Sequence, residues 1–588
     1  MTRQLFLSFF HPRQQGSRIK HSINLHHGVP WIESPLEKAS EFPCLYRRSD
    51  ATPIELFFDL FFVANLSTFT ASNDINSLEA LWSYVSFLGI IWFTWLQVTL
   101  FDIRFARDSI FERICKAVQL ATMVGFASAG SGFATQVREE NVWIFHALSI
   151  LLAVSRLILS LEYFLTSLLL HGTMPKAARS LSMISACLLS ASATYAGLYF
   201  VFGARTAKMG SYVWTVWWFL FAAETICVMF LSSQTPGIGF KDTYLNIRMG
   251  LLTLIIIGEG VISIARIVNR TVGGGGWTKW SFVHILGVTT AVYLLWLSYF
   301  DITPRAKLGK IRQQIWTGLH FPFHVLLILL MEGSQILALT LDVSLKLSHL
   351  RDTILFACET PQPPAEFAIN LLNSTIRDME INYNRGALVE KNSIQDILWM
   401  LRKSPFLCPV GMTDGALDMQ TSHHLMGNVT VALFSSMGIN PPEGDIVPHR
   451  SDQLLMMYLK LLGFVFLYYF TVASLAMFMF AVFFYVGHYD EVENSYRTRA
   501  TIMRVILGCS LLSIIAVTTN FDKAYKFMTS PMILFTVTLA LLLALLGDRL
   551  WDRLAPKSFE LEIPTENESR MVQPSFSLTE LSPVPTVQ

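Results

Sequence analysis

The chain has 588 residues, of which 52% are hydrophobic and only 15% are charged, and its net charge at pH 7 is +1. Soluble domains carry roughly 25% charged residues, so a soluble globular protein is excluded. The lack of a basic field argues against nucleic acid as a partner. The mean hydropathy of +0.45, with apolar runs near the roughly 20 residues that cross a bilayer, predicts an all-α, polytopic integral membrane bundle.

About twelve apolar segments are predicted to cross the membrane as transmembrane helices. The tenth is about 34 residues long, so it must tilt, kink or extend beyond the bilayer. The predicted spans are 54–71, 81–101, 115–135, 142–170, 180–203, 211–232, 244–268, 281–301, 317–341, 454–487, 500–518 and 530–547.

Lys and Arg gather mainly on one side of these spans, with Arg205 and Lys208 as exceptions. Because such a bias marks the cytoplasmic face, both termini are predicted to be cytoplasmic. The host is predicted to be the plasma membrane or an endomembrane. The predicted parts are a cytoplasmic leader at 1–50, about nine helices in 51–341, a long extracytoplasmic loop at 342–453, about three helices in 454–547 and a disordered cytoplasmic tail at 548–588.

The loop at 342–453 carries features expected outside the cytoplasm. Asn373 and Asn428 begin Asn-Ser-Thr and Asn-Val-Thr sequons, so both are glycosylation candidates. Cys358 and Cys408 lie in the same loop and are a candidate disulfide pair. The remaining cysteines lack a metal-binding spacing, and most are interpreted as small buried hydrophobic residues.

The first span opens with two carboxylates in the apolar stretch Pro53-Ile-Glu-Leu-Phe-Phe-Asp-Leu-Phe-Phe-Val63. Glu55 and Asp59 are four residues apart and therefore share one face of a helix. Since a carboxylate facing lipid is costly, both are expected to face the bundle interior, a partner or a water-filled cavity. They are interpreted as a cation or proton site at the cytoplasmic mouth of a pathway. The alternative is a fixed pairing with nearby arginines, namely Arg47, Arg48 or Arg104.

Two more acids lie deeper in predicted spans. Glu259 follows Arg248 by 11 residues, about 16 Å of helix, which places it near the middle of the bilayer. Gly258 and Gly260 flank it and permit a close helix approach or a local break. A pathway or gating role is predicted for Glu259, with a buried hydrogen bond to a neighbouring helix as the alternative. Glu224, in the sixth span, is a second candidate of this kind.

Arg156 and Glu162 share the fourth span. They are six residues apart and lie on different faces of the helix, so each is expected to pair with another helix.

His320 and His324, in His-Phe-Pro-Phe-His, are four residues apart and could bind a metal through two imidazoles on one helical face. A third ligand could come from Asp301, or from Glu332 if the helix breaks. A proton relay and ordinary buried histidines are the alternatives. Pro322 between them is also compatible with a helix that starts there.

A short internal echo links two segments. Trp95–Asp102 ends the second span and Trp296–Asp301 ends the eighth, and each follows a span that carries carboxylates. An offset of six spans preserves orientation and favours a parallel repeat, with chance similarity as the alternative. Asp102 and Asp301 therefore join the candidate ion-pathway residues.

The string Glu55–Val63, followed by Leu66-Ser67, resembles the opening signature of the low temperature requirement A family. The resemblance covers about residues 45–340, and the added loop and three spans are similar to the layout of fungal members. It implies an integral membrane protein and defines no activity, because the family name comes from a growth phenotype. Supporting similarities are Phe101-Asp102 with Arg104-Phe105, Ile257-Gly-Glu259, and Trp296 to Asp301.

These features favour a transporter or channel-like permease for protons, ions or a small solute that uses buried carboxylates. A non-transporting sensor or scaffold is the main alternative, and a membrane-embedded metal-dependent enzyme is a further one. No cofactor is expected, because neither a phosphate-binding motif nor a nucleophile elbow is present. The lipid bilayer is the expected partner, and the sequence leaves the oligomeric state open.

Overall fold

The computed structural model is helical, with one isolated β-bridge between Leu36 and Leu45 among the residues that it describes. Nine of the helices in this part of the chain are long and apolar enough to cross a membrane. The all-α, multi-pass membrane bundle expected from composition is therefore confirmed. The described residues are 29–37, 43–73, 75–202, 212–241, 243–272, 279–304, 309–358, 364–385, 387–403, 419–438, 451–488, 494–519 and 532–554, with isolated positions between 520 and 531.

A helix coincides with each of the twelve predicted spans. The first six are α1 (Pro53–Ser72), α2 (Leu78–Phe105), α3 (Ile110–Gly130), α4 (Val142–Leu170), α5 (Pro175–Val201) and α7 (Thr215–Gln234). The next six are α8 (Leu245–Val272), α9 (Lys279–Ile302), α10 (Lys310–Ala357), α14 (Ser451–Gly487), α15 (Asn494–Ser513) and α17 (Met532–Leu554).

Several helices begin at residues suited to that position. Ser77 and Ser109 are the N-caps of α2 and α3, and their hydroxyls accept hydrogen bonds from the backbone N–H groups of Ala80 and Glu112 at 3.1 and 3.2 Å. Pro53 begins α1, where a missing N–H removes no helical bond. Pro322 instead lies inside α10, so it does not mark a helix start.

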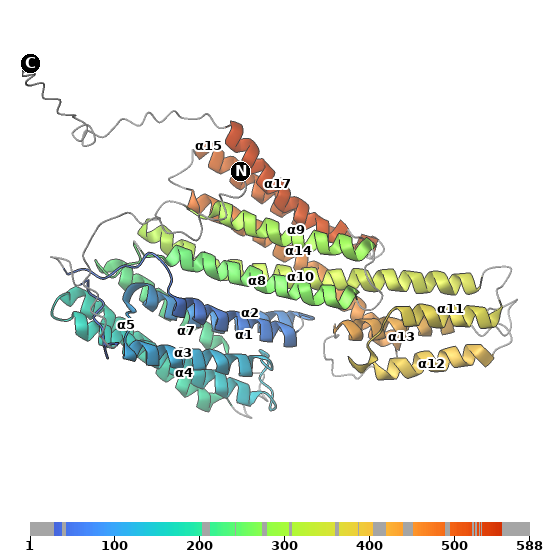
Figure 1. Ribbon diagram of the computed structural model, residues 1–588, viewed down its shortest axis with the longest axis horizontal. Coiled ribbons are helices and arrows are strands. Elements are labelled where there is room, and N and C mark those ends of the chain that lie inside the picture. The colour runs from blue at the N-terminus through green and yellow to red at the C-terminus, as the bar shows by residue number, and fades with distance from the viewer. Residues whose placement is uncertain are drawn as a thin grey trace, which may run out of the picture.

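Helix α2 is the centre of the first half of the bundle, between α1, α3, α4, α7, α8 and α10. Buried residues make up 89% of its apolar window, including Trp92 and Trp95. Helices α3, α4 and α5 lie together on one side, and α9, α14, α15 and α17 gather beyond α8 and α10 on the other (Figure 1). Asp102 and Arg104, near the end of α2, are buried and therefore held away from lipid.

The region predicted as a long loop, 342–453, is largely helical where it is described. Helix α10 runs for 48 residues, about 72 Å, which exceeds twice the roughly 30 Å hydrocarbon core, so it leaves the membrane and continues into this region. Polar sequence marks a segment that does not span, and it does not forbid helices that pack on one face. The helices here are α11 (Ala365–Asp378), η1 (Tyr383–Arg385), α12 (Leu388–Lys403) and α13 (Met419–Met437), while η2 (Ile514–Thr519) follows α15.

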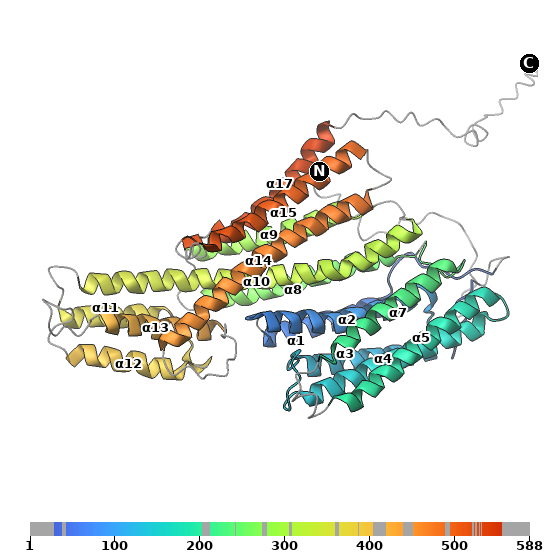
Figure 2. The ribbon, with the colours of Figure 1, turned by 180° about the vertical axis from the view of Figure 1, so that it is seen from behind.

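Helices α11, α12 and α13 stand at one end of the bundle beside the last part of α10 (Figure 2). The start of α1 and the end of α17 are thus at the end of the bundle opposite the α11–α13 region (Figures 1 and 2). The assignment of the cytoplasmic side stays a prediction from charge.

Candidate functional site

Asp59 forms a buried ion pair with Arg248 that joins α1 to α8. Its two carboxylate oxygens accept hydrogen bonds from Arg248 Nη1 and Nη2 at 2.6 and 2.7 Å. One of them also accepts a hydrogen bond from Trp95 Nε1 at 2.8 Å. All three side chains are buried, and a two-pronged pair with a third donor satisfies charges that the apolar interior would otherwise destabilise.

Glu55, one turn earlier, is held by a different set of groups. Its carboxylate accepts hydrogen bonds from the Tyr244 and Thr52 hydroxyls, each at 2.9 Å, and lies 2.9 Å from Arg48 Nη2. Arg48 also donates to the Asp102 backbone carbonyl at 3.0 Å. A fixed pairing with Arg47, Arg48 or Arg104 was the alternative interpretation of the two acids. Glu55 does pair with Arg48, whereas Asp59 pairs with Arg248, which was not among the three.

The other two arginines considered as partners bind elsewhere. Arg47 donates to the backbone carbonyls of Gly237 and Gly239 at 2.9 and 3.0 Å. Arg104 is buried and donates to the Tyr163 hydroxyl at 2.6 Å and to Ser232. Arg47 therefore connects the segment before α1 to the segment after α7, and Arg104 connects the end of α2 to the end of α7.

A cavity of about 640 Å³ opens beside this cluster where α1, α2 and α3 meet. Pockets for small ligands commonly enclose about 300–1,000 Å³, so the volume suits a small solute. Its wall has four acidic and four basic side chains, namely Glu55, Asp102, Asp108, Glu112, Arg48, Arg107, Arg113 and Lys116. We call this the charged cavity.

Most charges of the charged cavity are paired with each other. Lys116 pairs with Asp102, and Arg113 donates to both oxygens of Asp108 at 2.8 Å. Glu112 differs, because its Oε2 is buried and has no hydrogen-bond partner within the described part of the chain. The wall therefore contains a buried carboxylate oxygen that accepts no hydrogen bond within the described chain.

Polar side chains continue from this cavity into the bundle. Ser155 donates to Gln119 Oε1 at 2.8 Å, and the next residue, Arg156, donates to Thr94 at 3.0 Å and to Glu224 Oε2 at 2.9 Å. All five residues are buried, and they come from α2, α3, α4 and α7. We call them the polar row.

The polar row and the charged cavity are adjacent on α3. Lys116 lies on the cavity wall, and Gln119 follows it by three residues, which places the two side chains on one helical face. Arg156 pairs with another helix as expected, and Glu224 is its partner. The row thus links the cavity to the interior by hydrogen-bonding groups.

Glu259 is buried in α8, which continues without a break through its glycine neighbours. A Cβ atom on Gly260 would lie 2.0 Å from Met331 Sδ, so the Met331 side chain of α10 lies directly against α8 at this position. A Cβ atom on Gly258 would meet nothing within 4 Å. The close approach anticipated from the two glycines thus occurs at Gly260, and the role of Glu259 remains a prediction.

His324 is a buried, fully hydrogen-bonded residue between α2, α8 and α10. Trp92 Nε1 donates to its Nδ1 at 3.0 Å, so Nδ1 is an acceptor. Its Nε2 lies 2.8 Å from Thr253 Oγ1, and Thr253 donates its own proton to the Met249 carbonyl at 2.9 Å. Nε2 must therefore donate, and the network holds a neutral ring.

His320 also has both ring nitrogens hydrogen-bonded, but as the opposite tautomer. Its Nδ1 donates to the Trp316 carbonyl at 2.7 Å, and its Nε2 accepts from the Tyr299 hydroxyl at 2.8 Å. Both nitrogens of both rings are thus occupied. Among the described residues no group of three potential ligands could hold a metal, so the geometry favours ordinary buried histidines over a metal site.

The surroundings of Asp102 and Asp301 differ. Asp102 is buried and paired with Lys116, whereas the Asp301 side chain is 43% exposed and lies 3.7 Å from Arg549 Nη2. Because α10 is unbroken, Glu332 stays two turns beyond the histidines, and its carboxylate accepts from Gln335 at 3.0 Å. The sequence echo therefore does not extend to the environments of its acids.

The candidate modification sites lie on or near the α11–α13 region. Asn373 is exposed on α11, whereas Asn428 is buried in α13. Cys358 ends α10 and is disulfide-bonded. Cys408 lies outside the described residues, so its pairing with Cys358 remains a prediction.

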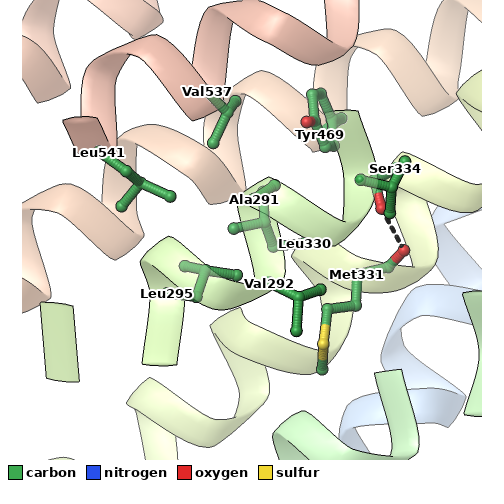
Figure 3. Close-up of a pocket in the computed structure, with 10 residues that line it drawn as sticks. Ala291, Val292, Leu295, Leu330, Met331, Ser334, Tyr469, Val537 and Leu541 are labelled. Carbon is green, nitrogen blue, oxygen red and sulfur yellow. Dashed lines mark hydrogen bonds between the residues drawn. The ribbon is translucent and has the colours of Figure 1, made fainter. Parts of the chain in front are cut away.

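A second cavity is much smaller and apolar. It encloses about 30 Å³ between α9, α10, α14 and α17, room for about one water molecule. Val292, Leu330, Met331 and Val537 face it, and the Ser334 hydroxyl donates to the Met331 carbonyl at 2.7 Å (Figure 3). A cavity of this size and lining holds no charged solute, so the charged cavity is the stronger candidate site.

Comparison with known proteins gives one family match. The model of the family described as bacterial low temperature requirement A protein matches residues 50–358, more than half of the chain. The match includes α1 to α10, the polar row and every charged residue of the charged cavity except Arg48. Searches of the curated proteins and of the solved structures each found no match.

Proposed function

The chain belongs to the low temperature requirement A family, and on this premise we propose that it moves protons, ions or another small solute across the membrane. The observation that carries the proposal is the charged cavity of about 640 Å³ at one end of a membrane bundle. Ionisable residues inside a membrane protein are costly, and those that persist commonly line solute or proton pathways.

The charges of the cavity favour a cation over an anion. Arg48, Arg113 and Lys116 are each engaged with an acidic partner, and Arg107 lies 3.7 Å from Glu33. Glu112 retains a buried oxygen with no hydrogen-bond partner in the described chain. A small cation or a proton would complete this set of charges, whereas an anion would have to displace an existing pair.

The polar row supports a path that continues beyond the cavity. Buried hydroxyl, amide and guanidinium groups can replace the hydration of a moving charge, while the aliphatic side chains around them cannot. The residues of the row are buried, so transport requires the row to rearrange. Alternating access by rocking of one group of helices against another provides such a change.

A non-transporting scaffold is a second candidate, and the ion pairs of Asp59 and Glu55 favour it. Their carboxylates are satisfied by Arg248, Trp95, Arg48 and two hydroxyls, an arrangement that holds α1, α2 and α8 together. In this alternative the acids lock helices and no solute moves. The two candidates predict different effects of changing Glu112, which has no such structural partner.

Flux measurements in proteoliposomes of the purified full-length protein test the proposal. Protons, sodium, potassium and ammonium would be compared for the wild type, Glu112→Gln and the exposed control Asp50→Asn. We expect Glu112→Gln to lower cation flux by about tenfold or more, equivalent to about 1.4 kcal/mol, with little change for the control. Absence of flux for every cation, from protein with an unchanged unfolding transition, would reject the permease and favour the scaffold.

A further inference from the structure

We propose that Glu162 is the proton-binding residue of this pathway, a buried carboxylic acid behind the charged cavity that couples proton movement to cation movement. The proposal rests on the proposed permease function and assigns a role to a residue outside the cavity wall. Glu162 lies in the membrane-spanning helix α4 and is 1% exposed.

The carboxylate of Glu162 lacks the hydrogen bonds that the other buried acids have. Within the described chain, neither of its oxygens accepts a hydrogen bond from nitrogen or oxygen. The group beside it is the Cys115 thiol of α3, which is a weak donor. Asp59 and Glu224 instead each have an arginine within 2.9 Å. The buried acids that join helices thus have a cationic partner, which Glu162 lacks among the described residues.

The charged groups around Glu162 are mostly of its own sign. From α3, Glu112 and Lys116 act on it, and from α2, Asp102 does. Lys116 already pairs with Asp102. The carboxylates of Glu162, Glu112 and Asp102 therefore lie near one ammonium group, and this group forms its ion pair with Asp102.

From α2, Arg104 reaches the next residue of α4, where its guanidinium donates to the Tyr163 hydroxyl at 2.6 Å and to Ser232, and within the described chain it gives no hydrogen bond to Glu162. Toward α5, α4 makes hydroxyl pairs, Ser160 with Ser185 and Ser167 with Ser182, at 3.0 and 2.7 Å. An uncompensated buried carboxylate costs several kcal/mol, and such a group commonly neutralises by taking up a proton. The protonated acid is therefore the resting form of Glu162.

The charged cavity supplies both the proton and the signal to release it. Glu112 lies on the cavity wall, three and four residues before Cys115 and Lys116 on α3, so its side chain and theirs share one face. In uptake, an O–H bond of a hydronium ion in the cavity breaks as an O–H bond forms on Glu162. In release, the proton returns to water when a cation at Glu112 stabilises the Glu162 anion.

Infrared difference spectroscopy of the full-length protein in lipid tests the proton site without measuring transport. The wild type is expected to show the C=O stretching band of a protonated carboxylic acid, which shifts in D₂O and weakens when cations are added. Glu162→Gln should lose the band, and the exposed control Glu140→Gln should keep it. A band that persists in Glu162→Gln, or is absent from the wild type, overturns the assignment.

Flux measurements then test coupling. Wild-type cation flux should depend on pH, Glu162→Gln should keep a residual flux that no longer depends on pH, and Glu162→Asp should restore the dependence in part. A purely structural role instead predicts an equal loss of flux at every pH and a lower unfolding midpoint for Glu162→Gln. If the band depends on Glu162 but no variant conducts, the proton site stands and the permease is rejected.

Discussion

At the scale of single residues, the chain keeps charge in an apolar interior by pairing acids and bases from different helices. Asp59 with Arg248, and Arg156 with Glu224, are pairs in which every side chain is at most 1% exposed. Replacing both members of such a pair by apolar residues is often tolerated, whereas removing one leaves an isolated buried charge. The two kinds of substitution therefore separate the energy of the pair from the penalty of breaking it.

We predict that Asp59→Ala destabilises the folded protein by about 3–5 kcal/mol, because Arg248 would be left buried without its carboxylate. The double variant Asp59→Leu/Arg248→Met should recover most of this loss, since it removes both charges and fills the space. Reversible unfolding in mixed micelles, followed by tryptophan fluorescence, gives the free energies.

Asp50→Asn provides the control, because Asp50 is exposed and bonds only to Ser49 in the described contacts. Its effect should stay within about 0.5 kcal/mol. If the double variant is as unstable as the single one, the ion pair itself, and not the isolated charge, accounts for the loss.

At the scale of helices, the sequence predicts well where the membrane-spanning helices lie along the chain, and it predicts poorly which helices carry the partners of the buried charges. The span predicted at 54–71 is the helix Pro53–Ser72, since hydropathy and the N-terminal proline are local signals. The span predicted at 317–341 is part of Lys310–Ala357, because hydropathy reports the membrane segment and not its helical continuation into water. The α11–α13 helices were missed for the same reason.

Partners of the buried charges depend on long-range packing. Arg248 lies 189 positions from Asp59, and no local pattern links them. The prediction that Glu162 pairs with another helix was wrong among the described residues, because the sequence shows a charge in a span and not whether another helix carries a partner for it. A count of acids against bases in neighbouring spans is the signal that comes nearest.

Gly258 and Gly260 give a matched prediction about helix packing. Gly260→Ala should destabilise by about 1–3 kcal/mol, because the added methyl group would overlap Met331 Sδ on α10. Gly258→Ala should be neutral or stabilise by up to about 1 kcal/mol, since it meets open space and Ala is the better helix former. Unfolding midpoints of both variants in the same lipid mixture measure the contrast.

Met331→Ala supplies the compensating change. It should restore part of the stability lost in Gly260→Ala, as the smaller side chain makes room for the methyl group. Equal effects of alanine at the two glycines would contradict the close approach of α8 and α10.

At the scale of the whole molecule, the bundle has two ends with different chemistry. The charged cavity lies near the start of α1, and the α11–α13 region stands at the opposite end. Charge bias in the loops predicts that the cavity end is cytoplasmic. Solute and proton would then enter the charged cavity from the cytoplasm, so the orientation decides the direction in which the proposed coupling operates.

Glycosylation of a chain synthesised with microsomes tests this orientation. Asn373 is exposed on α11, so the wild type should show a glycosidase-sensitive mobility shift that Asn373→Gln removes. Asn428 is buried where α13 packs against α10 and α14, so folded Asn428→Gln should keep the shift. A shift lost only in Asn428→Gln would contradict the packing of α13.

If no glycosylation-dependent mobility shift appears, labelling of an introduced cysteine determines on which side of the membrane the α11–α13 region lies. Val389, in α12, is 73% exposed and suits a Val389→Cys reporter. Reaction with a membrane-impermeant maleimide only after the microsomes are opened would keep the α11–α13 region in the lumen. Reaction with intact microsomes would place the region in the cytoplasm, and the charged cavity would then receive its solute and its protons from the other side of the membrane.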